Sequence, residues 1–229
     1  MTVTHRHLLA LGGAALALSG ITGLVGGMLH PVVDGQSHSV ASITAPGGPP
    51  AYLLLYGGAI LLMLGLPAVT AWLAPRVGVL GVVGLTLYFV GNALSAQSHL
   101  VVEGFVAREV PQAIPDDGSI VASGSFALLQ VVGGLVFVAG VLLTGIALLR
   151  RGSGVPWWIG AAFVLSALGV LVPLPEAPVL TGLQVELFEA VGTVGLGLLA
   201  VRAARSAQPA PAGSPYRAAA WTASTEKVT

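Results

Sequence analysis

The stretch VGVLGVVGLTLYFVGNALSAQSHL, residues 77–100, contains no Asp, Glu, Lys or Arg and decides the fold class of this chain. An apolar run of about 20 residues is long enough to cross the hydrocarbon core of a bilayer as a helix. Five further runs have the same character, and with the first they predict an all-α, polytopic membrane protein built as an antiparallel bundle of six transmembrane helices. The six expected spans are 8–29, 52–74, 77–100, 121–149, 156–173 and 180–201.

The overall composition agrees with a lipid environment. Hydrophobic residues make up 55% of the chain, the mean hydropathy is +0.91, and only nine acidic and nine basic residues occur among 229. A soluble domain carries about a quarter charged residues. The first span is longer than the apolar region of a signal peptide, so we expect it to be retained. The chain has no cysteine, which excludes disulfides, thiolate metal sites and cysteine nucleophiles.

Basic residues predict the orientation, because cytoplasmic segments of membrane proteins are enriched in Lys and Arg. With both termini inside, the segments 1–7, 75–76, 150–155 and 202–229 are cytoplasmic. They contain Arg6, Arg76, Arg150, Arg151, Arg202, Arg205, Arg217 and Lys227, and only Arg108 lies elsewhere. The expected outer loops are 30–51, 101–120 and 174–179. Basic residues at helix ends form no cluster for nucleic acid, so the expected partner is the lipid bilayer.

Two further expectations concern location. The abundance of Ala, Gly, Val and Arg with a single Lys is typical of a GC-rich bacterial genome, which makes the plasma membrane the expected location. Residues 206–229, rich in Pro and Ala without an apolar period, are expected to form a disordered cytoplasmic tail after the transmembrane domain of residues 1–205.

Polar side chains recur on one face near the outer end of several spans. Asn92, Ser95, His99 and Glu103 follow one another at helical spacing and form one stripe. Similar stripes occur in the first and sixth spans, and the fourth span contributes a glutamine. If the stripes face each other, they line a polar cavity whose expected residues are His30, Asn92, Ser95, His99, Glu103, Gln130, Glu186 and Glu189.

Glu189 is the most informative of these residues. If the sixth span begins near Leu180, Glu189 lies about 13 Å along the helix, and an ionised carboxylate facing lipid there would cost about 2–3 kcal/mol. It should therefore face the bundle interior, be protonated or pair with a cation, and His99 is the expected partner. This favours a protein that binds or moves a small solute or protons. The alternative is a non-enzymatic structural or partner-binding subunit, in which polar residues only mark helix ends.

A metal or haem site is a third possibility. His30, Asp34 and His38 are spaced by four residues, and with His99 they could bind zinc or iron. His30 and His99 could instead hold a haem. No cofactor follows from a recognisable motif, and no serine hydrolase signature is present, so an enzymatic activity is not expected.

Glycines predict close helix packing. Gly78, Gly81 and Gly84 recur every three residues, as do Gly20, Gly23 and Gly26. Small residues let helix backbones approach each other where apolar side chains gain nothing by leaving lipid. Tyr88, in the middle of the third span, is expected to serve packing alone.

Overall fold

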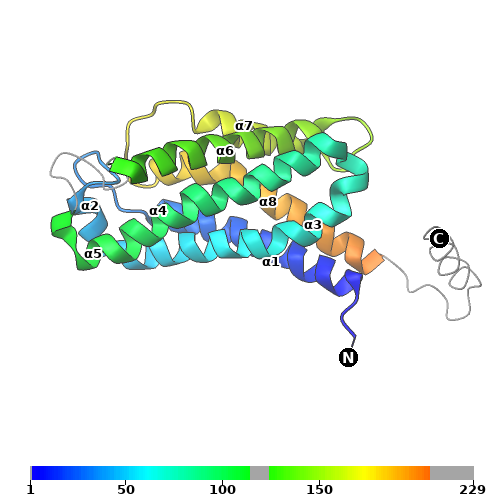
Figure 1. Cartoon of the computed structure of the whole chain (residues 1–229), viewed down its shortest axis with the longest axis horizontal. Helices are drawn as coiled ribbons and strands as arrows, with labels where there is room; N and C mark the ends of the chain where they lie inside the picture. Colours follow the sequence, from blue (N-terminus) through cyan, green and yellow to red (C-terminus); the bar gives the residue numbers. More distant parts are fainter. Residues whose placement is uncertain (1, 114–123, 207–229) are drawn as a thin grey trace, which may run out of the picture.

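The computed structural model describes residues 2–113 and 124–206, and in this part of the chain the fold is all-helical (Figure 1). The expected tail lies outside the described residues, apart from its first residue. The elements are α1 (His5–Leu29), α2 (Val40–Thr44), α3 (Gly48–Gly91), η1 (Asn92–Gln97), α4 (Ser98–Val101), η2 (Val102–Val106), α5 (Ala107–Glu109), η3 (Pro111–Ala113), α6 (Gly124–Leu149), α7 (Trp157–Gly169) and α8 (Leu180–Ser206).

Helix boundaries follow local chemistry. The Thr4 hydroxyl accepts a hydrogen bond from the backbone N–H of His7 at 3.3 Å and caps the start of α1. Pro31 follows the last residues of α1, and Pro156 directly precedes α7. Proline restricts the residue before it and lacks an N–H, so it commonly marks such boundaries.

Helix α3 is a hairpin of two helical arms. Gly78 has φ 63° and ψ −166°, a backbone conformation that glycine adopts without steric cost. Beyond Gly78 the chain runs back along the first arm (Figure 1), and the Asn92 side-chain amide donates to the carbonyl of Ala59 at 3.2 Å. The sequence predicted a packing role for Gly78, but a Cβ here would meet nothing within 4 Å, so this residue makes no close helix contact and serves the turn instead.

The second arm of α3 continues well beyond the expected boundary at residue 100. Helical structure persists through η1, α4 and η2 to Glu109 in α5, and η1 and η2 are π-helical. The predicted outer loop 101–120 is therefore wrong for its first part, and Glu103 lies on a helix. Single π-helical turns inserted in α-helices are frequent at functional sites.

Neighbouring helices are antiparallel and pack through small residues. Gly13 of α1 faces Gly197 of α8, and Gly12 faces Gly65 of α3. Farther along the bundle, Gly140 of α6 lies against the backbone of Tyr88. A Cβ at any of these glycines would come within 3.0 Å of a neighbouring helix, so the predicted role of glycine in close packing applies widely in this bundle.

Within residues 2–113 and 124–206, four helical segments are apolar and long enough to cross a membrane: His5–Leu29, Gly48–Glu109, Gly124–Leu149 and Leu180–Ser206. The expected fifth span is shorter than predicted, because α7 ends at Gly169 after 13 residues. At 1.5 Å per residue such a helix is about 20 Å long, less than the ~30 Å of a bilayer core. The sixth expected span does begin at Leu180, which places Glu186 and Glu189 on a helix.

The two ends of the bundle differ in character (Figure 1). The start of α1, the turn of α3, the connection between α6 and α7 and the end of α8 lie together; we call this the basic end. It carries Arg6, Arg76, Arg150, Arg151, Arg202 and Arg205. The opposite end, with the segment 30–47 and the run from η1 to α5, is called the cavity end.

Candidate functional site

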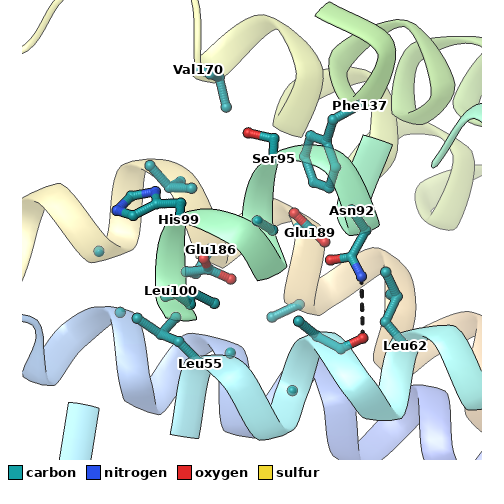
Figure 2. A pocket seen from close by; sticks show the side chains of 18 of the residues that line it. Leu55, Leu62, Asn92, Ser95, His99, Leu100, Phe137, Val170, Glu186 and Glu189 are labelled. Atoms are coloured by element: carbon teal, nitrogen blue, oxygen red, sulfur yellow. Dashed lines mark hydrogen bonds between the residues drawn. The ribbon is translucent and has the colours of Figure 1, made fainter. Parts of the chain in front are cut away.

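A cavity of about 370 Å³ lies between the helices towards the cavity end (Figure 2). Helices α1, α3, α4, α6 and α8 and the π-helical segment η1 all contribute to its wall. Hydrocarbon side chains such as Leu55, Leu62 and Phe137 form much of the lining. The polar and titratable lining residues are Ser19, His30, Ser37, His38, Asn92, Ser95, His99, Thr181, Glu186, Glu189 and Thr193.

Two carboxylates from α8 face this cavity. The Tyr88 hydroxyl, from the second arm of α3, donates a hydrogen bond to Oε1 of Glu189. Glu186 lies one turn nearer the cavity end, where Gly23 and Gly27 of α1 leave room for its side chain: a Cβ at Gly27 would lie 2.6 Å from Glu186 Cγ. Within the described residues, Glu186 has no hydrogen-bond partner in the protein.

The opposite wall is built by the polar stripe on η1 and α4. Asn92 is buried, and its bond to Ala59 fixes the amide across the α3 hairpin. The Ser95 hydroxyl donates to Oε1 of Gln130 at 3.2 Å, and Gln130 Nε2 donates to the Ser98 hydroxyl at 2.8 Å. Gln130 thus stands behind the lining rather than in it, and it braces α6 against η1 and α4.

No lysine or arginine lines the cavity within the described ranges 2–113 and 124–206. Arg108, the one basic residue expected away from the cytoplasmic segments, donates hydrogen bonds to the carbonyls of Ile43 and Ala45 at 2.9 and 3.2 Å. It joins α5 to α2 outside the cavity. Glu186 and Glu189 therefore lack a permanently cationic side chain as a partner.

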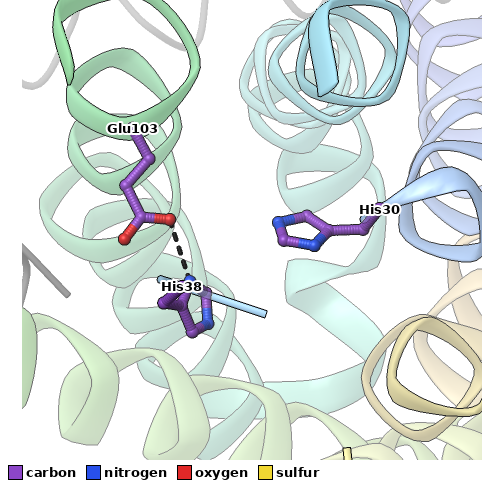
Figure 3. A group of neighbouring side chains, drawn as sticks. All are labelled: His30, His38 and Glu103. Carbon is purple, nitrogen blue, oxygen red and sulfur yellow. Dashed lines mark hydrogen bonds and ion pairs between the residues drawn. The ribbon is translucent and has the colours of Figure 1, made fainter. Parts of the chain in front are cut away.

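A cluster of three histidines and one carboxylate lies at the mouth of the cavity. Oε2 of Glu103 is 2.8 Å from Nδ1 of His38 and 2.8 Å from Nε2 of His99. The Glu103 side chain is 0% exposed, whereas His38 and His99 are 37% and 25% exposed. The ring of His38 also lies 4.9 Å from that of His99 and 5.7 Å from that of His30, measured between ring centroids. Figure 3 shows His30, His38 and Glu103 converging on one space.

One hydrogen bond to a distant segment and one within the segment 30–47 hold the backbone around His38 in place. The backbone N–H of Ser37 donates to the carboxylate of Glu176, which belongs to the connection between α7 and α8. The Val33 N–H donates to the Ser42 hydroxyl at 3.1 Å and closes the segment on itself. His38 is therefore placed by contacts that sequence spacing does not reveal.

The electrostatic surroundings of the histidines differ. Burial, together with the neighbouring imidazole of His38, lowers the pKa of His30 to about 4. Burial by itself would also lower the pKa of His38, but the hydrogen bond to Glu103 and the charge of that carboxylate outweigh it and raise the pKa above 6.5. At neutral pH, His30 is therefore a neutral imidazole, whereas protonation of His38 is favoured by its carboxylate partner.

Most of the expected site residues come together in the structure. His30, Asn92, Ser95, His99, Glu186 and Glu189 all line the cavity, while Glu103 and Gln130 lie directly behind it. The expected pair of His99 and Glu189 does not occur among the hydrogen bonds of the described residues, because His99 binds Glu103 and Glu189 binds Tyr88. Asp34 lies exposed in the turn between Val33 and Gln36 and takes no part in the cluster.

Tyr88 is a functional position that sequence reasoning missed, and the contact of His38 with Glu103 was not predicted either. The apolar surroundings of Tyr88 indicated packing, and only its tertiary contact shows that the hydroxyl binds a carboxylate. His38 was considered only as part of a spaced set with Asp34. Ser19 and Thr193 also line the cavity. Periodicity places both on the polar stripes of their helices, but they were not among the expected lining residues.

No family model matches this chain, and no curated protein or solved structure matches it.

Proposed function

We propose that this protein is an integral membrane protein whose cavity binds a small cation, the proton included, with Glu186 and Glu189 as counter-charges. The observation that carries the proposal is the presence of two carboxylates in a cavity that no lysine or arginine lines among the described residues. A cavity of about 370 Å³ falls within the range of small-molecule sites, about 300–1,000 Å³.

A cation fits because of the energetics of carboxylates away from water. An ionised carboxylate in a medium of low dielectric constant needs a cation or hydrogen-bond donors nearby. Glu189 has the Tyr88 hydroxyl, but Glu186 has no protein donor within the described residues. A proton or a small organic cation would supply the missing charge, whereas an anion would add to the repulsion.

The orientation belongs to the same proposal. We place the chain in a bacterial plasma membrane with both termini in the cytoplasm and the basic end inside. The six crossings of this proposal are α1, the two arms of the α3 hairpin, α6, α8 and the short helix α7 together with the residues next to it. The positive-inside rule supports this orientation, because six arginines gather at the basic end. The cavity end then faces outwards, and the cavity takes up its cation from that side.

Thermal unfolding of the purified protein in detergent tests cation binding. Ammonium, methylammonium and tetramethylammonium chlorides should raise the unfolding temperature of the wild type more than the chloride of a bulky cation, N-methylglucamine, at equal ionic strength. Glu186→Gln and Glu189→Gln should remove the difference. Glu109→Gln is the matched control, because Glu109 is exposed on α5 and does not line the cavity.

Movement of protons is tested in vesicles. Proteoliposomes that contain a trapped pH-sensitive dye should acidify under an imposed membrane potential, and Glu189→Gln should slow the acidification. If neither cation stabilisation nor proton flux is seen in the wild type, the protein is better described by the alternative function, a structural or partner-binding subunit.

A further inference from the structure

The cluster at the mouth of the cavity contains three side chains that can each offer one ligand atom to a metal ion. His30, His38 and Glu103 place these atoms within 4.8 Å of one another. The residues come from the end of α1, the segment after it and η2, so tertiary structure alone brings them together (Figure 3).

The hydrogen bond of the His30 ring favours its role as a metal ligand. Its Nδ1 lies 3.2 Å from the carbonyl oxygen of Pro31. A carbonyl can only accept, so this contact requires a proton on Nδ1 and leaves the Nε2 lone pair free. Histidines that bind metals almost always donate the other ring N–H to a carbonyl or carboxylate in this way, which selects the tautomer and orients the ring.

The carboxylate of Glu103 is held from behind. Nε2 of His99 lies 2.8 Å from Oε2 of Glu103, one helical turn away on the same continuous helix. In this structure, Nδ1 of His38 lies 2.8 Å from the same oxygen. When an ion binds, this nitrogen can coordinate the ion instead, while His99 keeps its hydrogen bond to Glu103. Such a hydrogen-bonded carboxylate is the usual arrangement around a metal ligand.

Donor type and spacing indicate the class of ion. Two imidazoles and one carboxylate suit zinc and other divalent transition metals, whereas calcium and magnesium prefer oxygen ligands alone. Ligand atoms bound to tetrahedral zinc lie about 3.3 Å apart, so the separation of 4.8 Å requires side-chain shifts of less than about 2 Å. The partial exposure of His38 and His99 leaves space for a water as fourth ligand.

A single ion fits better than a haem. A haem held by His30 and His99 would have to lie between their rings. The ring of His38 lies beside both of them, with centroids 5.7 Å from His30 and 4.9 Å from His99, so it takes the space that a haem would need. Nε2 of His99 is hydrogen-bonded to Glu103 and is therefore not available to a haem iron.

We propose that His30, His38 and Glu103 bind one divalent transition-metal ion, for which Zn²⁺ is the best-fitting probe, with His99 as a positioning residue for Glu103. The metal site lies at the mouth of the cavity, and its ligands do not include Glu186 or Glu189. It therefore goes beyond the proposed binding of a small cation and can hold whether or not that proposal does.

Zinc binding to the full-length protein in detergent tests the site. The protein is purified with a tag that contains no histidine, stripped with a chelator and titrated with Zn²⁺ against a chromophoric competitor. We expect one tight equivalent. Co²⁺ in place of Zn²⁺ should give the visible absorption bands of a four-coordinate site, which a hydrogen-bonded cluster without metal affinity would not give.

Variants assign the ligands. His38→Ala and Glu103→Gln should each weaken Zn²⁺ binding by more than about 100-fold, and His99→Gln by about 10- to 100-fold, the usual range for loss of a residue behind the ligands. His30→Ala provides a second test if Glu103→Gln does not fold, because Glu103 is fully buried. Elution volume and helical content of each variant confirm folding.

Matched controls separate this site from other histidines and from the cavity carboxylates. The double variant His5→Ala and His7→Ala, at the basic end, should bind Zn²⁺ like the wild type, and so should Glu189→Gln. The proposal is overturned if the wild type binds no tight equivalent. It is equally overturned if binding survives His38→Ala and Glu103→Gln, or is lost only with His5 and His7.

Discussion

The hydroxyl of Tyr88 donates a hydrogen bond to Oε1 of Glu189 and thereby joins the second arm of α3 to α8 across the interior of the bundle. Tyr88 is 0% exposed, and its ring packs edge-on against Phe137 and Phe163. The pair combines an apolar contact with the donor that a carboxylate inside the bundle requires. The contact therefore holds Glu189, which lines the cavity, against the second arm of α3.

Tyr88→Phe should lower the free energy of unfolding. The substitution keeps the ring but removes the donor, and a hydrogen bond contributes about 0.5–1.5 kcal/mol with a neutral acceptor and about 1.5–3 kcal/mol with a charged one. Chemical unfolding in detergent measures the change. Tyr56→Phe is the control, because the Tyr56 ring packs against Phe105 and its hydroxyl has no hydrogen bond within the described residues. Equal stability of Tyr88→Phe and the wild type would show that the bond does not contribute.

Gly182→Ala should separate α8 from α1 near the cavity. A Cβ at Gly182 would lie 2.1 Å from the backbone carbonyl of Gly27, and backbone atoms cannot move aside as a flexible side chain can. We expect a loss of at least about 1–3 kcal/mol from overpacking. Gly57→Ala, also inside a helix, is the control, since its Cβ would meet nothing within 4 Å. A Gly182→Ala protein as stable as Gly57→Ala would contradict the close contact.

The stability of the metal-free protein should depend on pH through two histidines in opposite directions. The pKa of His38 is raised, so its contribution is complete below pH 6.5 and is lost as pH rises through the raised value. The pKa of His30 is lowered to about 4, so its contribution is present above pH 6.5 and declines as pH falls from about 6.5 towards 4.

Unfolding temperatures measured with a chelator from pH 4 to 9 test this dependence. His38→Gln should flatten the alkaline side of the profile, and His30→Asn should flatten the acidic side. Profiles that superimpose for the wild type and both variants would show that neither imidazole is coupled to folding.

Labelling of introduced cysteines tests the proposed orientation, because the chain has no cysteine of its own. Gln36→Cys, exposed at the cavity end, should react with a membrane-impermeant maleimide in intact cells. Ser206→Cys, exposed at the basic end, should react only after permeabilisation. The opposite pattern would turn the cavity towards the cytoplasm.

Local sequence patterns predicted much of the bundle but misplaced several boundaries. Apolar run length identified helices correctly, because lipid requires that each spanning segment satisfy its own backbone hydrogen bonds. The spacing of glycines could not distinguish the turn at Gly78 from a packing contact, since glycine is common in both. Apolar run length also ended the third span near residue 100. The helix continues further, because Glu103 is buried against His38 from a distant segment and His99 from the preceding turn.

The sequence by itself determined that the chain is helical and apolar, and that the polar stripes face the interior. The physical reason is that polar groups are costly against lipid, so one-dimensional periodicity is enough to decide which face turns inwards. Only the tertiary structure decided which polar groups meet. Glu189 binds Tyr88 rather than His99, and Glu103 joins His38 from a segment 65 residues away. These pairings depend on the relative rotation and depth of the helices. Contacts between glycines and side chains far apart in the sequence determine that rotation and depth, and no local pattern contains this information.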